Sequence, residues 1–162
     1  MSSPLDAVGP RCRRYALALG CLTLLFALRV AAQSIQHWAP VTWLPPFSQF
    51  QGSALPYWLL LGTQLLLLSL MIAVIFRVEG GRSLGHARVA RTLRWVGGVY
   101  MAGSLGRIAV GLALPHAPAW FTAWIPAIFH VMLAAFVLTL AAYTVAVHRA
   151  KNPARADPPE AA

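Results

Sequence analysis

Four blocks of about 20 mostly apolar residues limit what this chain can fold into more than any other feature. They cover residues 15–34, 57–76, 95–114 and 126–147. Each block matches the roughly 20 residues that a helix needs to cross a bilayer. Only 10% of the 162 residues are charged, whereas soluble domains carry about 25%. We therefore predict an all-α membrane protein with a single four-helix transmembrane bundle over residues 15–148.

The basic residues predict the orientation of the bundle. Eleven of the 13 Lys and Arg residues lie in segments 1–14, 77–94 and 148–162, and none lies in segments 33–56 or 115–125. Short cytoplasmic loops carry an excess of Lys and Arg, so both termini are expected in the cytoplasm (N-in/C-in). The net charge of +9 then reflects topology, and no nucleic-acid partner is predicted.

The two ends of the chain are expected outside the bundle. Residues 1–14 are predicted to be a cytoplasmic N-terminus, and residues 149–162 a disordered cytoplasmic tail, because they have little to bury. A signal peptide cleaved after Ala32 is an alternative for the first block, although Arg29 within it argues against cleavage. Abundant Arg and Ala favour a GC-rich bacterial genome, so the expected location is the bacterial inner membrane.

The segment between the first two blocks is uncharged but rich in aromatic residues and proline. One interpretation is an aromatic belt in the headgroup region, where tryptophan normally concentrates. The other is a proline-stiffened lid over the outer mouth of the bundle, which excludes water from a site beneath it. The residues proposed for this lid are Trp38, Trp43, Phe47 and Trp120.

A small set of polar residues lies at similar depth within the apolar blocks. At a rise of ~1.5 Å per residue, Arg29, Gln64, Arg107 and His130 all fall in the predicted outer half of the bilayer. Tyr100 and Ser104 share a helix face with Arg107, because steps of three and four residues return to one side of a helix. The residues predicted to contact a ligand are Arg107, His130, Gln64, Arg29, Tyr100 and Ser104.

The two intramembrane arginines have no predicted carboxylate partner. An arginine inside a spanning helix costs about 2.5–3.5 kcal/mol to insert, so something must compensate for it. For Arg29 the simplest interpretation is a side chain that snorkels to the outer headgroups. For Arg107 the partner is expected to be a lipid phosphate, a backbone carbonyl, water, a carboxylate of another protein or a bound ligand. The acids, all in predicted cytoplasmic segments, are Asp6, Glu79, Asp157 and Glu160.

Catalytic and metal motifs are absent from the sequence. Without paired carboxylates, an activated nucleophile or a glycine-rich phosphate loop, no catalytic residue and no enzymatic activity are predicted. A zinc or copper site needs a cluster of Cys, His and carboxylates, so no metal site is predicted either. No cofactor is predicted, with haem and quinone kept as alternatives. A haem on His130 needs a second axial ligand, for which His37 and His116 are the outer candidates.

Small residues recur at every fourth position of the third block, at Gly98, Ala102 and Gly106. Such a series lets helices approach closely. It predicts a helix-packing face, either inside the four-helix bundle or against a homodimer or partner protein. Gln64 likewise fits a hydrogen bond between helices.

Three functional classes fit these observations. The first is a noncatalytic accessory, assembly or scaffold subunit, because nothing in the chain demands chemistry. The second is a binder of a lipophilic or anionic ligand (quinone-, haem- or lipid-like) in the outer half of the bundle. The third is a small oligomeric transporter or channel, although no inverted repeat is visible. The expected partners are the lipid bilayer and another membrane protein or a second copy.

Overall fold

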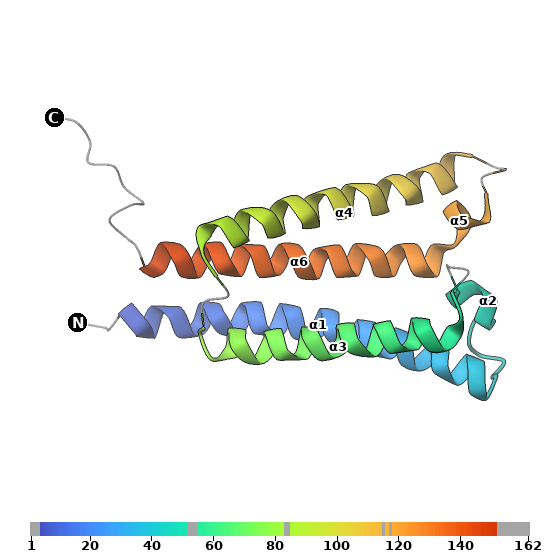
Figure 1. Cartoon of the computed structure of the whole chain (residues 1–162), viewed down its shortest axis with the longest axis horizontal. Helices are drawn as coiled ribbons and strands as arrows, with labels where there is room; N and C mark the ends of the chain where they lie inside the picture. Colours follow the sequence, from blue (N-terminus) through green and yellow to red (C-terminus); the bar gives the residue numbers. More distant parts are fainter. Residues whose placement is uncertain (1–3, 52–54, 83–84, 115, 117, 152–162) are drawn as a thin grey trace.

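Four long and two short helices make up the described part of the chain, which is residues 4–51, 55–82, 85–114, 116 and 118–151 of the computed structural model (Figure 1). The helices are α1 (Pro4–Trp38), α2 (Phe47–Phe50), α3 (Tyr57–Glu79), α4 (Ala87–Ala113), α5 (Ala119–Thr122) and α6 (Trp124–Lys151). The four long helices are each long and apolar enough to cross a membrane. The prediction of an all-helical, multi-pass membrane protein is confirmed at this level.

Proline and glycine set the ends of several helices. Pro46, Pro56 and Pro118 come directly before α2, α3 and α5, where the missing N–H of proline costs no helical hydrogen bond. After α3, Gly81 has a φ of 63°, in the left-handed region that favours glycine. This turn leads the chain back toward α4.

The long helices extend past the predicted spans. Helix α1 begins at Pro4, α4 begins at Ala87 and α6 continues to Lys151. The added turns of α4 and α6 are rich in alanine and arginine, which are good helix formers, so these two helices continue where their apolar blocks stop. Residues 149–151, assigned from sequence to the disordered tail, are therefore helical, and the rest of that tail lies outside the described residues.

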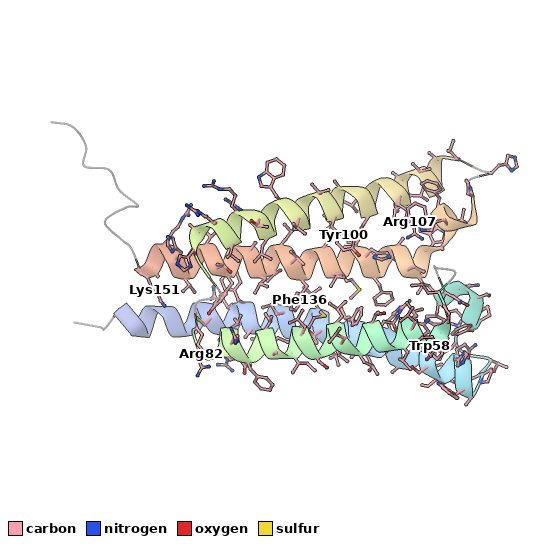
Figure 2. The ribbon with its side chains drawn as sticks, in the orientation of Figure 1. Trp58, Arg82, Tyr100, Arg107, Phe136 and Lys151 are labelled. Atoms are coloured by element: carbon pink, nitrogen blue, oxygen red, sulfur yellow. The ribbon has the colours of Figure 1, made fainter. Side chains whose placement is uncertain are left out.

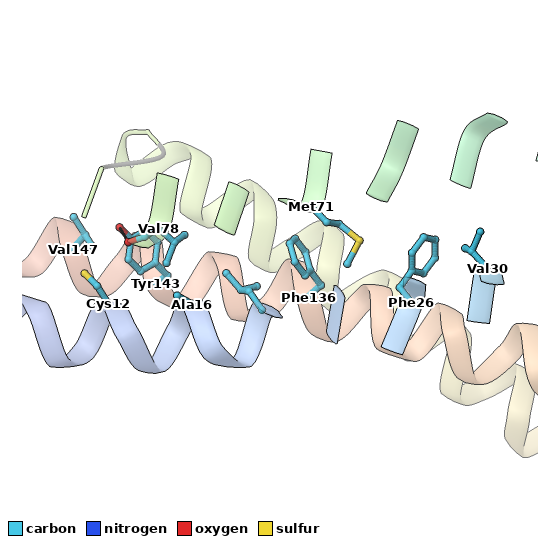
Figure 3. Close-up of a cluster of buried hydrophobic side chains, with 10 residues drawn as sticks. Cys12, Ala16, Phe26, Val30, Met71, Val78, Phe136, Tyr143 and Val147 are labelled. Atoms are coloured by element: carbon cyan, nitrogen blue, oxygen red, sulfur yellow. Dashed lines mark hydrogen bonds between the residues drawn. The ribbon is translucent and has the colours of Figure 1, made fainter. Parts of the chain in front are cut away.

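The helices pack in the order α4, α6, α1, α3, with α4 against α6, and α1 against both α6 and α3 (Figure 1). The main hydrophobic core joins α1, α3 and α6 without α4. Figure 3 shows Tyr143 of α6 among Cys12, Val78 and Val147, and Phe136 beside Met71. The Tyr143 hydroxyl also donates to the Arg82 carbonyl at 3.1 Å, which fastens the end of α3 to α6.

Both ends of the described chain lie at one end of the molecule, and α2 and α5 lie at the other (Figure 1). We call these the terminal end and the α2/α5 end. An even number of spans returns the chain to the side from which it began. That the terminal end is cytoplasmic stays a prediction from its basic residues.

The small-residue series of α4 does not pack inside the chain. A Cβ added at Gly98 or Gly106 meets no atom within 4 Å, and Ala102 is exposed. The interpretation of this series as an internal packing face is therefore wrong. Helix α4 meets α6 through Gly97 instead, where an added Cβ lies 3.0 Å from the Cγ and Cδ2 atoms of Leu138.

A Gly97→Val protein is expected to lose about 1–3 kcal/mol of unfolding free energy, because its side chain collides with α6. The free energy of unfolding is measured in mixed detergent, with circular dichroism as the probe of helix content. Gly103→Val is the matched control, since an added Cβ there has nothing within 4 Å. Equal losses in the two variants would show that helix propensity, and not the contact with α6, sets the effect.

Candidate functional site

A half-open cavity of about 310 Å³ lies between α1, α3 and α6, with α2 beside it. We call it the outer cavity, because it lies toward the α2/α5 end, which the basic residues predict to be the outer one. Helical spacing explains its walls, because residues at steps of three, four and seven share one helix face. Its lining residues are Phe26 and Arg29 from α1; Phe50 from α2; Leu55, which precedes α3; Leu60, Thr63, Gln64 and Leu67 from α3; and Pro126, Phe129, His130 and Leu133 from α6.

Arg29 is held inside the protein and does not snorkel. It is only 8% exposed, and its Nη2 donates to the carbonyl oxygen of Phe50 at 2.9 Å. Its guanidinium also lies 5.4 Å from the ring centroid of Phe129. The Nε of Arg29 is buried and has no hydrogen-bond partner. The expected snorkelling to the headgroups is thus wrong, because the side chain bonds to the backbone of α2 and not to a lipid headgroup.

Gln64 contacts a residue that the sequence interpretation missed. Its Nε2 donates to Oε1 of Gln33 at 3.2 Å, and the two side chains are 7% and 0% exposed. This bond leaves Gln33 Nε2 and Gln64 Oε1 buried without partners. The expected helix-to-helix hydrogen bond of Gln64 is therefore present. The signal for Gln33 was its place four residues after Arg29, on the same face of α1.

His130 lines the outer cavity and is bonded to α4. Its Nδ1 shares a hydrogen bond with the Tyr100 hydroxyl, and the two rings meet edge to face with centroids 5.7 Å apart. Ser104 is buried and donates to the Tyr100 carbonyl, one turn back on α4. Tyr100 on α4 thus orients the His130 ring through this hydrogen bond, whereas the Ser104 hydroxyl bonds to the backbone of its own helix.

Arg107 is separate from the outer cavity. Its Nε donates to the Trp120 carbonyl at 2.8 Å, its Nη2 to the Ala123 carbonyl at 3.4 Å, and its guanidinium lies 4.2 Å from the Trp120 ring centroid. Figure 2 shows Arg107 where α4 meets α5. Its partner is therefore the backbone of the α5 turn. Gly111 permits this contact, because a Cβ there would overlap the Phe121 carbonyl.

The tryptophans proposed as a lid do not line the outer cavity. Trp38 and Trp43 are each 74% exposed, and Trp120 packs with Arg107. Phe47 packs against His37, with ring centroids 4.9 Å apart. The aromatic residue of this segment that does line the cavity is Phe50. The lid prediction omitted Phe50, although it included Phe47, the same residue type three positions earlier.

The histidines expected to complete a haem site lie elsewhere. His37 stacks on Tyr57 with centroids 3.9 Å apart, and His116 is exposed between α4 and α5. His130 is the histidine that lines the outer cavity. Among the residues that the structure describes, no three His, Cys, Asp or Glu side chains are close enough together to hold a metal ion.

Arg29, Gln64 and His130 thus line the outer cavity together, and Gln33 is hydrogen-bonded to Gln64 without lining it. Arg107 and Ser104 do not line the cavity. Its polar groups can bind and orient a ligand, and they include no nucleophile paired with a base. No protein-family model matches the chain, and no curated protein or solved structure is significantly similar to it.

Proposed function

We propose that this multi-pass membrane protein binds a lipophilic ligand with a polar headgroup in the outer cavity. The observation that carries the proposal is a set of buried polar atoms without hydrogen-bond partners, one each on Arg29, Gln33 and Gln64. Arg29 and Gln64 line the cavity, and Gln33 is bonded to Gln64. A ligand headgroup supplies the missing partners after small rotations of these side chains.

Buried polar groups without hydrogen-bond partners destabilise the ligand-free protein. An unpaired buried polar group costs about 1–3 kcal/mol, and native proteins keep few of them. Three such groups beside one cavity indicate that the ligand-free protein is destabilised, and that a ligand which bonds to these groups relieves this destabilisation. The volume of about 310 Å³ is at the lower end of the range of small-molecule sites, roughly 300–1,000 Å³.

The lining favours a lipophilic ligand over water alone. A polar cavity of this size holds ordered water, but seven of its 12 lining residues are Phe or Leu. The apolar lining suits a hydrocarbon tail or ring, and the polar groups suit its head. Because neither His37 nor His116 lines the cavity, a quinone-like or lipid-like ligand is favoured over haem.

An accessory or scaffold role is the second candidate. The observation that favours it is the free face of α4, where Gly98 and Gly106 have no neighbour within 4 Å of an added Cβ. Small residues at this spacing let another helix approach closely. This role does not compete with ligand binding, because the face of α4 lies apart from the outer cavity.

Replacing Leu60 with tryptophan is expected to fill the cavity and reduce the copurifying ligand at least about tenfold, because Leu60 forms part of the α3 wall. The measurement is mass spectrometry of compounds extracted from protein purified in mild detergent. Leu59→Trp is the matched control, since Leu59 is exposed and does not line the cavity. If no ligand copurifies with the wild type, or if the two variants hold equal amounts of it, the ligand proposal is wrong. The accessory role is then the favoured function.

A further inference from the structure

The two intramembrane arginines differ in how completely the protein satisfies them. Arg107 has two carbonyl partners and an aromatic ring within 4.2 Å. Arg29 has one carbonyl partner, a more distant ring at 5.4 Å, and a buried Nε with no partner. The protein completes the surroundings of one arginine from its own backbone and leaves those of the other incomplete, beside a cavity.

The charge of Arg29 also has no counter-charge nearby. Among the side chains that the structure describes, the one acid is Glu79, at the terminal end of α3. It lies 15 residues from Gln64, or about 22 Å along the helix. The neighbours of Arg29 are therefore neutral dipoles and apolar rings. A buried charge in such surroundings is best compensated by an opposite charge that is also hydrogen-bonded.

The other polar groups of the cavity add mostly donors. The Gln33–Gln64 pair leaves one amide NH₂ group and one amide oxygen unpaired, whichever way the two amides are turned. His130 has its Nδ1 bonded to Tyr100, and when the phenol donates, the imidazole carries its proton on Nε2. Among the buried groups without partners, Arg29 Nε and the amide NH₂ group supply three N–H hydrogens, against one acceptor oxygen on the amide pair. Such a set suits a headgroup rich in acceptor oxygens.

We propose that the ligand of the outer cavity is an amphiphilic acid, with an anionic oxygen headgroup paired with Arg29 and an apolar tail. The inference rests on the proposed function and specifies its ligand class. A guanidinium binds carboxylate and phosphate oxygens through parallel N–H groups, and the free Nε–H of Arg29 supplies one of them. The Phe and Leu side chains of the lining contact the first carbons of the tail, and the half-open cavity lets the remainder pass into lipid.

Three probes with one tail and different heads test this inference: oleate, oleyl phosphate and the neutral oleamide. Binding to the full chain in nanodiscs of zwitterionic lipid is measured by native mass spectrometry. At least one of the two anions is expected to bind at least about tenfold tighter than oleamide, and the better one identifies the headgroup. Arg29→Met is expected to abolish this preference, and Arg29→Lys to retain part of it, because it keeps the charge but loses the fork of donors. Arg107→Met, the same change at the other arginine, is expected to leave the preference intact.

Opposite results would separate the two proposals. Equal binding of oleamide and both anions to the wild type overturns the acid inference, and the proposed function survives if Leu60→Trp blocks all three probes. A neutral copurifying ligand has the same consequence. If no probe binds the wild type better than Leu60→Trp, and nothing copurifies, both proposals fail. Should the Arg29 variants not fold, the comparison of probes on the wild type decides the inference by itself.

Discussion

An Arg107→Met protein is expected to release α5 from α4 and to keep its cavity ligand. The change removes both hydrogen bonds to the α5 turn and the contact with the Trp120 ring. Each hydrogen bond to a charged group contributes about 1.5–3 kcal/mol, so losing both should make local opening at least about 100-fold more frequent. The measurement is hydrogen exchange at the backbone amides of residues 119–124, alongside extraction of the bound ligand.

A second variant reaches the same state by a steric route. In Gly111→Ala the new methyl group overlaps the Phe121 carbonyl while Arg107 is intact, so α5 must move away. Gly106→Ala is its control, because the added Cβ has open space there. Unchanged exchange in Arg107→Met would mean that other contacts hold α5. Loss of the ligand in that variant would show that Arg107 does belong to the ligand site.

The sequence predicts the spanning helices well because the information is local. A block of apolar residues as long as the bilayer is thick has few alternatives to a helix. Depth along a helix follows from the rise per residue, and this places Arg29, Gln64 and His130 at one level. The structure brings these three to one cavity.

Helix rotation and the choice of neighbours are not local, and here the sequence interpretation is incomplete. Glycines occur on several faces of α4, and spacing alone does not tell that Gly97 meets α6 while Gly98 and Gly106 meet nothing. Arg107 lies at the depth of the cavity but on α4, which packs mainly against α6 among the long helices and takes no part in the main core. Depth was therefore predictable, whereas membership of the site was decided by packing.

The aromatic loop shows a similar limit. Trp38, Trp43, Phe47 and Phe50 belong to one uncharged aromatic segment, and the lid prediction included Phe47 but not Phe50, although the two are the same residue type. The structure buries Phe50, and the Phe50 carbonyl accepts the hydrogen bond from Arg29. A backbone carbonyl as the partner of a buried arginine leaves no mark on residue identity, so the sequence holds no signal for it.

Replacing Gln33 and Gln64 together with leucine is expected to leave the ligand-free fold at least as stable as the wild type, whereas either single replacement destabilises it. A single change leaves the remaining amide buried with no partner at all, at a cost of about 1–3 kcal/mol. The double change removes every unpaired atom of the pair and substitutes apolar side chains of similar size. Unfolding in mixed detergent across the four proteins gives the coupling energy, expected to be about 1–3 kcal/mol.

The same double variant is expected to lose its ligand, so that stability and binding change in opposite directions. A stabilising change that abolishes binding is the signature of a site held in an unfavourable free state. The control cycle uses Ser34→Ala and Tyr57→Phe, which remove another hydrogen bond between α1 and α3, 3.0 Å long and not part of the cavity lining. That cycle should leave the ligand in place. If the leucine double variant keeps the ligand, the amide pair does not recognise it. If both single variants match the wild type in stability, the unpaired amide groups do not destabilise the ligand-free protein, and a ligand has no such cost to relieve.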